Sequence, residues 1–235
     1  MQPPTAEALL RAWERGRNRH PVDRALLLHG LAAPDAEPES LADEPLGRRN
    51  VALTHLHQEL FGRRIRADLA CPGCGTRLQC ELDAAALLAT PASASGTVEV
   101  DGLAFRLPTS RDLASILEER DPSHGALILA RRCLTAPAIG ADDARLETLL
   151  DRVEDALERA DPWADVTVDV HCEVCGHAWT SPLDLARFVW DEVEAYAVRL
   201  LDQIHLLAHA YGWSEPEILA LSDSRRTAYL DRVTA

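Results

Sequence analysis

Four cysteines stand in two short turns of the same type, far apart in the chain. One turn reads Cys71-Pro72-Gly73-Cys74-Gly75 and the other reads Cys172-Glu173-Val174-Cys175-Gly176. In each turn two cysteines three residues apart precede a glycine, so a tight bend can direct both thiolates at one point. Four thiolates are a typical ligand set of a structural zinc ion, which they surround tetrahedrally. The sequence therefore predicts one structural zinc, Zn(2+), that joins the two ends of a long inserted segment and is held by Cys71, Cys74, Cys172 and Cys175.

Other uses of the cysteines fit the sequence less well. Residues 1–16 contain prolines and charges instead of the apolar run of a secretory signal, which disfavours disulfides. A redox pair of the thioredoxin type explains one such turn but not two. A catalytic zinc keeps one position open for water, whereas four thiolates fill it. His171 and His177 flank the second turn and could replace a thiolate, although strand positions explain them more simply. Cys80 and Cys133 lie in apolar segments and are expected to be small buried side chains.

The composition limits the kind of protein that this chain can be. Its 235 residues, 47% of them hydrophobic, suffice for a sizeable core and exclude wholesale disorder. No apolar run reaches the roughly 18 residues of a membrane helix. Because metal-binding thiols fit a reducing compartment, we expect a cytoplasmic protein with no membrane contact. The formal net charge of −14 argues against nucleic acid as a partner. All 24 basic residues are arginine, which excludes a Schiff-base lysine and a P-loop lysine.

The periodicity predicts an α+β protein, mainly helical, in a single domain that spans residues 1–235. Helices are expected in an N-terminal part (5–62), in an insertion that also carries a hairpin (97–161), and in a C-terminal part (182–232). The expected helical ranges are 6–15, 21–30, 48–60, 126–133, 144–160 and 182–211, with two short helices after Ser214 and Ser222. The acidic, proline-rich segment 31–45 is expected to be a solvated linker. The inserted helices are expected to share one core with the C-terminal helix, because their apolar stripes need a partner.

Turn and cap signals give the remaining boundaries. Asp101-Gly102 is a strong hairpin signal between two alternating segments. Strands are expected near each cysteine turn, so the turns compose a split zinc ribbon of residues 68–83 with 165–181. Ser181–Asp184 has a capping-box pattern with proline at the first helical position. Gly212 is expected to end the long C-terminal helix in a left-handed conformation.

No catalytic motif is present in the sequence. It contains no GxSxG nucleophile elbow, no GxGxxG after a strand and no HExxH. His205 and His209 are four residues apart and could bind a metal from one helix face. Leucines surround them and no glutamate follows the first, so packing is the simpler explanation. The sequence gives no case for an enzyme.

The C-terminal sequence carries a distinctive pattern, YGW-SE-x-x-IL-x-LS-x-x-RR, over residues 211–226. With Trp190-Asp191-Glu192-Val193 before it, this region resembles the T4-type baseplate hub assembly chaperones of contractile tailed phages and related bacterial contractile injection systems. Segments 13–16, 46–49 and 107–113 resemble the injection-system branch, so the similarity spans nearly the whole chain. The resemblance implies a non-enzymatic chaperone that binds a baseplate or hub subunit before it is incorporated. Zinc turns do not define that family, so the metal prediction depends on cysteine spacing alone.

Two other functions remain open at this point. One is a zinc-ribbon regulatory protein that binds nucleic acid or RNA polymerase, since CPxCG turns are common in such proteins. A nucleic-acid ribbon should place arginines around its turns. Here only Arg77 lies close, whereas Glu81, Asp83, Asp169 and Glu173 surround them. The other function is a structural component of the baseplate.

A partner-binding surface can be suggested from aromatic and charged residues. Trp190, Trp213 and Tyr229, in the C-terminal helices, are candidates for its apolar centre. An acidic helix face could guide docking, and its residues are Glu147, Asp151, Glu154, Asp155 and Glu158. A packed helix corner and a solvated face are the simpler explanations of the two features.

Overall fold

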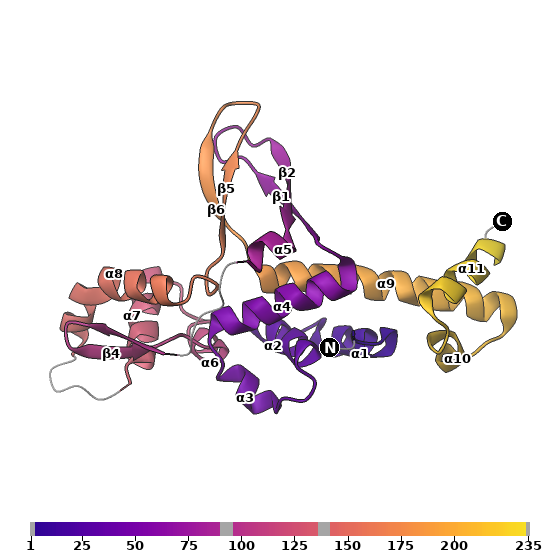
Figure 1. Cartoon of the computed structure of the whole chain (residues 1–235), viewed down its shortest axis with the longest axis horizontal. Helices are drawn as coiled ribbons and strands as arrows, with labels where there is room; N and C mark the ends of the chain where they lie inside the picture. Colours follow the sequence, from indigo (N-terminus) through magenta and orange to yellow (C-terminus); the bar gives the residue numbers. More distant parts are fainter. Residues whose placement is uncertain (1–2, 90–95, 136–141, 234–235) are drawn as a thin grey trace.

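A computed structural model describes residues 3–89, 96–135 and 142–233. Figure 1 shows an extended molecule in which one long helix, α9 (Leu185–Tyr211), lies along the long axis. A β arm projects sideways from it, an αβ unit lies at one end, and two short helices and the C-terminus lie at the other. The chain is a mainly helical α+β protein, as the sequence predicts.

The remaining helices and the strands are short. The helices are α1 (Ala6–Gly16), α2 (Pro21–Ala32), α3 (Pro38–Ala42), α4 (Leu46–Phe61), α5 (Ala84–Leu87), α6 (Ser110–Ala114), α7 (Pro122–Cys133), α8 (Asp143–Ala160), α10 (Glu215–Leu219) and α11 (Asp223–Val233). The strands are β1 (Arg64–Ala70), β2 (Arg77–Asp83), β3 (Thr97–Val100), β4 (Leu103–Arg106), β5 (Thr167–His171) and β6 (Ala178–Pro182). Within the described residues the strands form three separate two-stranded antiparallel sheets, β1–β2, β3–β4 and β5–β6.

The main helical body consists of α1, α2, α4 and the first half of α9. Leu28, Leu53 and Val193 are fully buried in its core, and Trp190 is only 1% exposed. The backbone of Gly16 passes so close to Trp190 that a Cβ there would overlap the indole ring. The Arg24 guanidinium covers the same ring at 4.9 Å from its centroid. Trp190 is therefore a core residue, and its suggested place in a partner-binding surface is wrong.

A second cluster lies along the other half of α9, where α10 and α11 fold back on the helix. Leu200, Ile204 and Leu207 of α9 pack there against Ile218 of α10. The turn between α9 and α10 depends on Gly212, whose φ of +67° is left-handed. A short helix then starts after Ser214, as the sequence predicts, and Ser214 forms a capping box with Glu217.

The expectation of one shared core is wrong. Residues of β3, β4, α7 and α8 form a cluster of their own, with Phe105, Cys133 and Leu146 at its centre. This αβ unit is compact because its strands and helices bury their apolar faces on one another. Its hairpin turns at Asp101-Gly102, with φ of +50° and +77°, as the sequence predicts.

The αβ unit is joined to the helical body mainly by hydrogen bonds. Leu46 N–H donates to the carbonyl of Pro108 at 2.9 Å. Gly47 N–H donates to the Asp161 carboxylate at 2.9 Å, and a Cβ on Gly47 would collide with that carboxylate. The Arg49 guanidinium donates to the Ser110 hydroxyl at 3.0 Å. The start of α4 therefore contacts both ends of the αβ unit through polar groups.

Two further expectations need correction. Residues 31–45 are not wholly a solvated linker, because α3 buries Leu41 and Ala42. The long helix does not start at Pro182, which pairs with Thr167 as the last residue of β6. Asp184 caps the helix instead, accepting a hydrogen bond from Arg187 N–H at 3.0 Å. In both cases packing against distant parts of the chain decides the local structure.

We predict opposite effects of alanine at two glycines that have open space around them. Gly212→Ala should destabilise the protein by about 1–2 kcal/mol, because an L-residue is strained at positive φ. Gly30→Ala, inside α2, should stabilise it by about 0.5–1 kcal/mol, because alanine loses less backbone entropy. Denaturant unfolding measures both changes. Equal effects of the two substitutions would contradict the left-handed turn.

Two histidines are buried in the helical body. His57 lies between the rings of Phe61 and Phe188, and neither of its ring nitrogens has a hydrogen-bond partner among the described residues. Burial lowers the pKa of His57 below the ordinary value. Burial also lowers the pKa of His29, although Glu44, 3.5 Å away, acts in the opposite direction.

The protein should lose stability as the pH falls below about 6.5, the ordinary pKa of histidine. The unfolded chain then binds protons that the buried imidazoles resist, so acid favours unfolding. His57→Leu should reduce the loss of stability between pH 7 and pH 5, measured by denaturant unfolding at each pH. His55→Leu, the same substitution at an exposed position of the same helix, is the control and should reduce the loss less than His57→Leu does. A steep loss that persists unchanged in His57→Leu would show that other groups cause it.

Candidate metal centre

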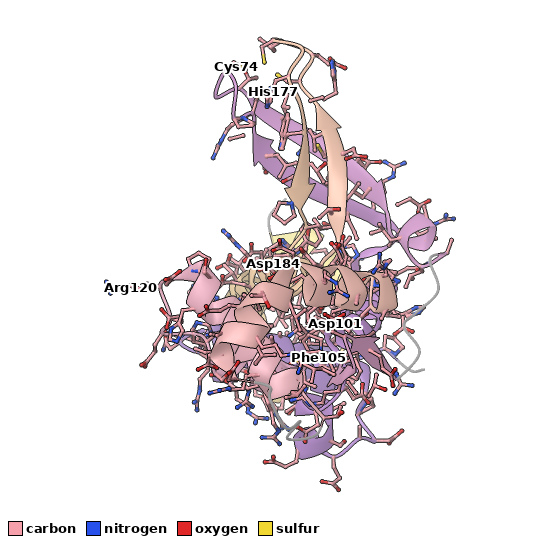
Figure 2. All side chains as sticks on the ribbon, turned by 90° about the vertical axis from the view of Figure 1, so that its left-hand side faces the viewer. Cys74, Asp101, Phe105, Arg120, His177 and Asp184 are labelled. Carbon is pink, nitrogen blue, oxygen red and sulfur yellow. The ribbon has the colours of Figure 1, made fainter. Side chains whose placement is uncertain are left out.

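Two of the three hairpins, β1–β2 and β5–β6, form the arm that projects from α9 (Figure 1). At their ends the cysteine turns meet, and Figure 2 shows Cys74 and His177 at the far end of the arm and Asp184 near its base. The base contains a small apolar cluster that includes Ile65 of β1, Trp163 and Leu185 of α9. The arm is therefore anchored at the start of the long helix.

The two cysteine turns have the same local structure. Cys71 N–H donates to the Thr76 carbonyl at 2.9 Å, and Cys172 N–H donates to the His177 carbonyl at 2.8 Å. In each turn the N–H of the trailing glycine donates to the carbonyl of the first cysteine at 2.8 Å. Both glycines, Gly75 and Gly176, have a φ of +73°. This left-handed conformation explains why glycine follows each cysteine pair.

The four cysteine sulfurs lie together, as the sequence predicts. Their Sγ atoms all lie within 4.8 Å of one another, although the cysteines come from two hairpins. The Sγ atoms of Cys71 and Cys175 are 3.6 Å apart, and those of Cys74 and Cys172 are 3.7 Å apart. Metal–sulfur bonds of about 2.3 Å in a tetrahedral zinc site place the sulfurs about 3.8 Å apart. The cluster thus has the size of a four-thiolate metal site.

The protonation of the four thiols depends on their closeness. Hydrogen bonding by Thr76 lowers the pKa of the Cys74 thiol to about 6. A backbone hydrogen bond at His177 lowers the pKa of Cys175, but the neighbouring thiols outweigh it and raise that pKa to about 12. One thiolate at this spacing therefore opposes ionisation of the next. A divalent cation at the centre would remove this repulsion, because it stabilises coordinated thiolates.

The other candidate ligands lie outside the cluster. His177 stacks on Trp179 at 5.9 Å, and its Cβ lies against the backbone of Gly73. The His205 and His209 rings stack on each other at 6.5 Å. Within the described residues, no second group of three or more possible metal ligands is found.

The two remaining cysteines differ from each other in burial. Cys133 is buried in the αβ unit, where loss of water contact raises the pKa of its thiol to about 11. This confirms the expectation of a small buried side chain. Cys80, on β2, is only half-buried, so the same expectation is not met there.

Strand β1 starts at Arg64, before the predicted ribbon, and it brings two arginines to the arm. Arg64 and Arg66 are exposed on β1, and Glu81 of β2 lies 3.4 and 3.8 Å from them, respectively. Arg63 likewise pairs with Asp83 at 2.8 Å. The arginines are thus partly neutralised, and the arm does not present an uncompensated basic surface of the kind that binds nucleic acid.

The other predicted contact residues lie far from the cysteines. Trp213 and Tyr229 are half-buried and lie together at the other end of the molecule, with ring centroids 4.9 Å apart. The five carboxylates of the acidic face, Glu147 to Glu158, are all exposed on α8. The structure therefore does not bring the predicted aromatic and acidic groups together.

Comparisons with known proteins give no relative. The chain matches no protein-family model, no curated protein and no solved structure. In the described parts of the chain, no helix combines the length and the apolar character needed to cross a membrane.

Metal binding should require the four clustered cysteines and should stabilise the protein. With zinc at about 100 times its Kd, the gain is about 2.7 kcal/mol, because only the folded chain offers the complete site. Cys172→Ser should abolish that gain, measured by denaturant unfolding with and without zinc. Cys80→Ser is the control, since Cys80 lies on the same arm but outside the cluster. Equal zinc stabilisation of both variants would exclude Cys172 as a ligand.

Proposed function

We propose that this protein is a non-enzymatic assembly chaperone, which binds a baseplate or hub subunit of a contractile phage tail or injection system before incorporation. We also propose that the cysteine cluster binds zinc and that this zinc is structural. The sulfur spacing supports a closed tetrahedral site, in which four protein ligands leave no position for a substrate. The metal then holds the arm together and takes no part in a reaction.

The observation that carries the chaperone proposal is the C-terminal corner. The residues of the family-like pattern fold into one unit where α9, α10 and α11 meet. Tyr211 stacks on Trp213 with ring centroids 4.7 Å apart, and Tyr229 packs edge-on against both. Tyr211 is 39% exposed, so the cluster reaches the surface. Partly exposed aromatic clusters are frequent centres of protein–protein contacts.

The last arginine of the pattern, Arg226, stabilises the packing of this corner. Arg226 is 3% exposed, although it carries a charge. Its Nε donates to Gln203 Oε1 of α9 at 2.9 Å, and its Nη2 donates to Asp223 at 2.6 Å. Arg226 therefore fixes α11 on α9, which holds Tyr229 beside Trp213. The pattern thus encodes a rigid surface element.

The proposed role explains why such a surface is needed. A subunit that later joins a symmetric assembly exposes apolar surface beforehand and is prone to aggregate. A chaperone covers that surface reversibly. Co-expression with this protein should raise the yield of one soluble hub or baseplate subunit, and deletion of the gene should leave sheaths or tubes without competent baseplates.

Single substitutions can distinguish a residue that contacts the partner from one that only stabilises the fold. Tyr211→Ala should weaken binding of the subunit by about 1–3 kcal/mol, that is, by about five- to 150-fold, while thermal unfolding changes little. Val198→Ala is the matched control, because Val198 is 47% exposed on the same helix but lies outside the aromatic cluster. Normal, fully active particles from the deletion strain would refute the chaperone proposal.

A further inference from the structure

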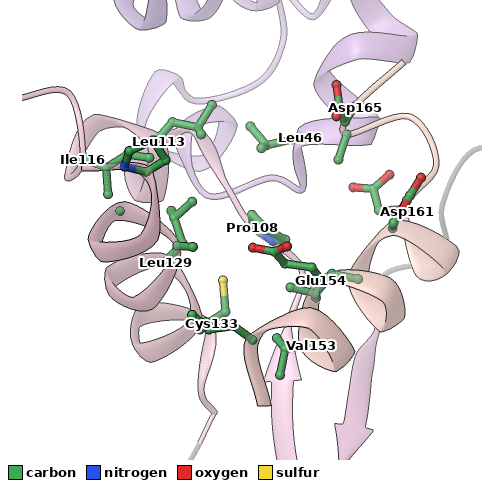
Figure 3. Close-up of a pocket in the computed structure, with 18 of the residues that line it drawn as sticks. Leu46, Pro108, Leu113, Ile116, Leu129, Cys133, Val153, Glu154, Asp161 and Asp165 are labelled. Carbon is green, nitrogen blue, oxygen red and sulfur yellow. The ribbon is translucent and has the colours of Figure 1, made fainter. Parts of the chain in front are cut away.

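A groove of about 620 Å³ lies between the αβ unit and the start of α4. Figure 3 shows Leu113, Ile116 and Leu129 along one wall and Asp161 and Asp165 along the other. The walls come from α6, α7, α8 and the segment that follows α8. No residue of the cysteine cluster or of the C-terminal corner lines the groove.

One side of the groove is apolar and open to solvent. Leu113, Ile116 and Leu129 are half-exposed, as are Leu150 and Leu157 of α8. Side chains of this size are normally buried in a monomer when they are contiguous. Their exposure in one concave surface favours a binding site for an apolar group.

The groove is also acidic. Six carboxylates line it: Glu119 and Asp121 between α6 and α7, and Glu154, Glu158, Asp161 and Asp165 on α8 and the segment after it. The described lining residues include no arginine or histidine. Glu154, Glu158 and Asp165 are exposed and form no ion pair with any described residue. Their charges are therefore available to a partner.

The groove is already formed without a partner. Asp161 is only 1% exposed, and its carboxylate accepts the hydrogen bond from Gly47 N–H that joins the acidic wall to α4. The backbone bond from Leu46 N–H to Pro108 joins α4 to the segment before α6. A site fixed in this way costs little conformational entropy to fill.

We infer that this groove binds a basic amphipathic segment of a partner protein. Such a segment places apolar side chains against Leu113, Ile116 and Leu129 while its arginines or lysines face Glu154, Glu158 and Asp165. An acidic rim repels nucleic acid and anionic membranes, so charge complementarity favours a cationic peptide. The inference deepens the proposed function, on which it depends for the identity of the partner, because it gives the chemistry of the bound subunit segment. Of the five carboxylates on the acidic face of α8, only Glu154 and Glu158 line the groove, so only these two are expected to guide docking there.

The test uses a fluorescein-labelled helical peptide with leucines on one face and arginines on the other. Anisotropy should show binding at least about tenfold tighter than that of a peptide with glutamates in place of the arginines. Glu154→Gln with Glu158→Gln should weaken binding about three- to tenfold, because two rim charges are lost. Glu147→Gln with Asp151→Asn is the matched control: it removes the same charge from exposed positions on the same helix outside the groove.

The apolar wall is tested separately. In methyl NMR spectra of the full chain, the arginine peptide should shift the Ile116 methyl resonances, and Ile116→Glu should weaken binding by more than about tenfold. A scrambled arginine peptide that binds equally well, equal effects of the two carboxylate pairs, or unmoved Ile116 resonances would overturn the inference. So would concentration-dependent dimerisation that Ile116→Glu abolishes, since the occupant would then be a second copy of the chain.

These outcomes remain distinct from those of the proposed function. Peptide binding is measured on the purified protein and does not require contractile particles. A groove that binds the peptide in a protein whose deletion leaves particles normal would refute the chaperone role alone. A defective deletion strain together with a groove that does not bind the peptide would refute the groove inference alone.

Discussion

The continuous apolar face of α9 is the constraint on which most of the structure depends. This helix of 27 residues, about 40 Å long at 1.5 Å per residue, contributes to three separate apolar clusters. Leu185 lies at the base of the arm, Trp190 lies in the helical body, and Ile204 and Leu207 support the C-terminal corner. One rigid element therefore fixes the relative positions of the cysteine arm and the aromatic corner, which share no direct packing among the described elements.

Local sequence rules predict the features that short segments determine. The cysteine spacing, the Asp101-Gly102 turn and the left-handed Gly212 each depend on the conformation of a few residues, and each was predictable. The features that escaped prediction depend on distant contacts. Strand β1 alternates charged with apolar residues, but two of its apolar residues are alanine and only Ile65 is buried, so its strand pattern is weak. The groove could not be predicted, because it forms only when α7 packs on α8 and α4 joins the αβ unit through hydrogen bonds.

Some carboxylates of this acidic chain stabilise the fold, and others form an acidic surface. Asp112 is fully buried, and burial acts against its charge, but hydrogen bonds from Arg106, Thr109 and Arg132 hold its pKa well below the ordinary value. Asp161 likewise serves the junction with α4. Among the described residues, the carboxylates without an ion-pair partner include Glu154, Glu158 and Asp165 beside the groove. A net charge of −14 is therefore compatible with specific structural roles for individual acidic residues and with a localised acidic surface.

The position of the cysteine cluster has a mechanical consequence. Residues 71 and 175 lie side by side, whereas the αβ unit lies between them in the sequence. With a metal bound, the chain between the two turns becomes a closed ring, and the metal–sulfur bonds provide a direct path across it. A pulling force applied to the two ends of the protein would then pass through the cysteines and bypass the αβ unit. The αβ unit would keep its fold under loads that unravel the terminal helices.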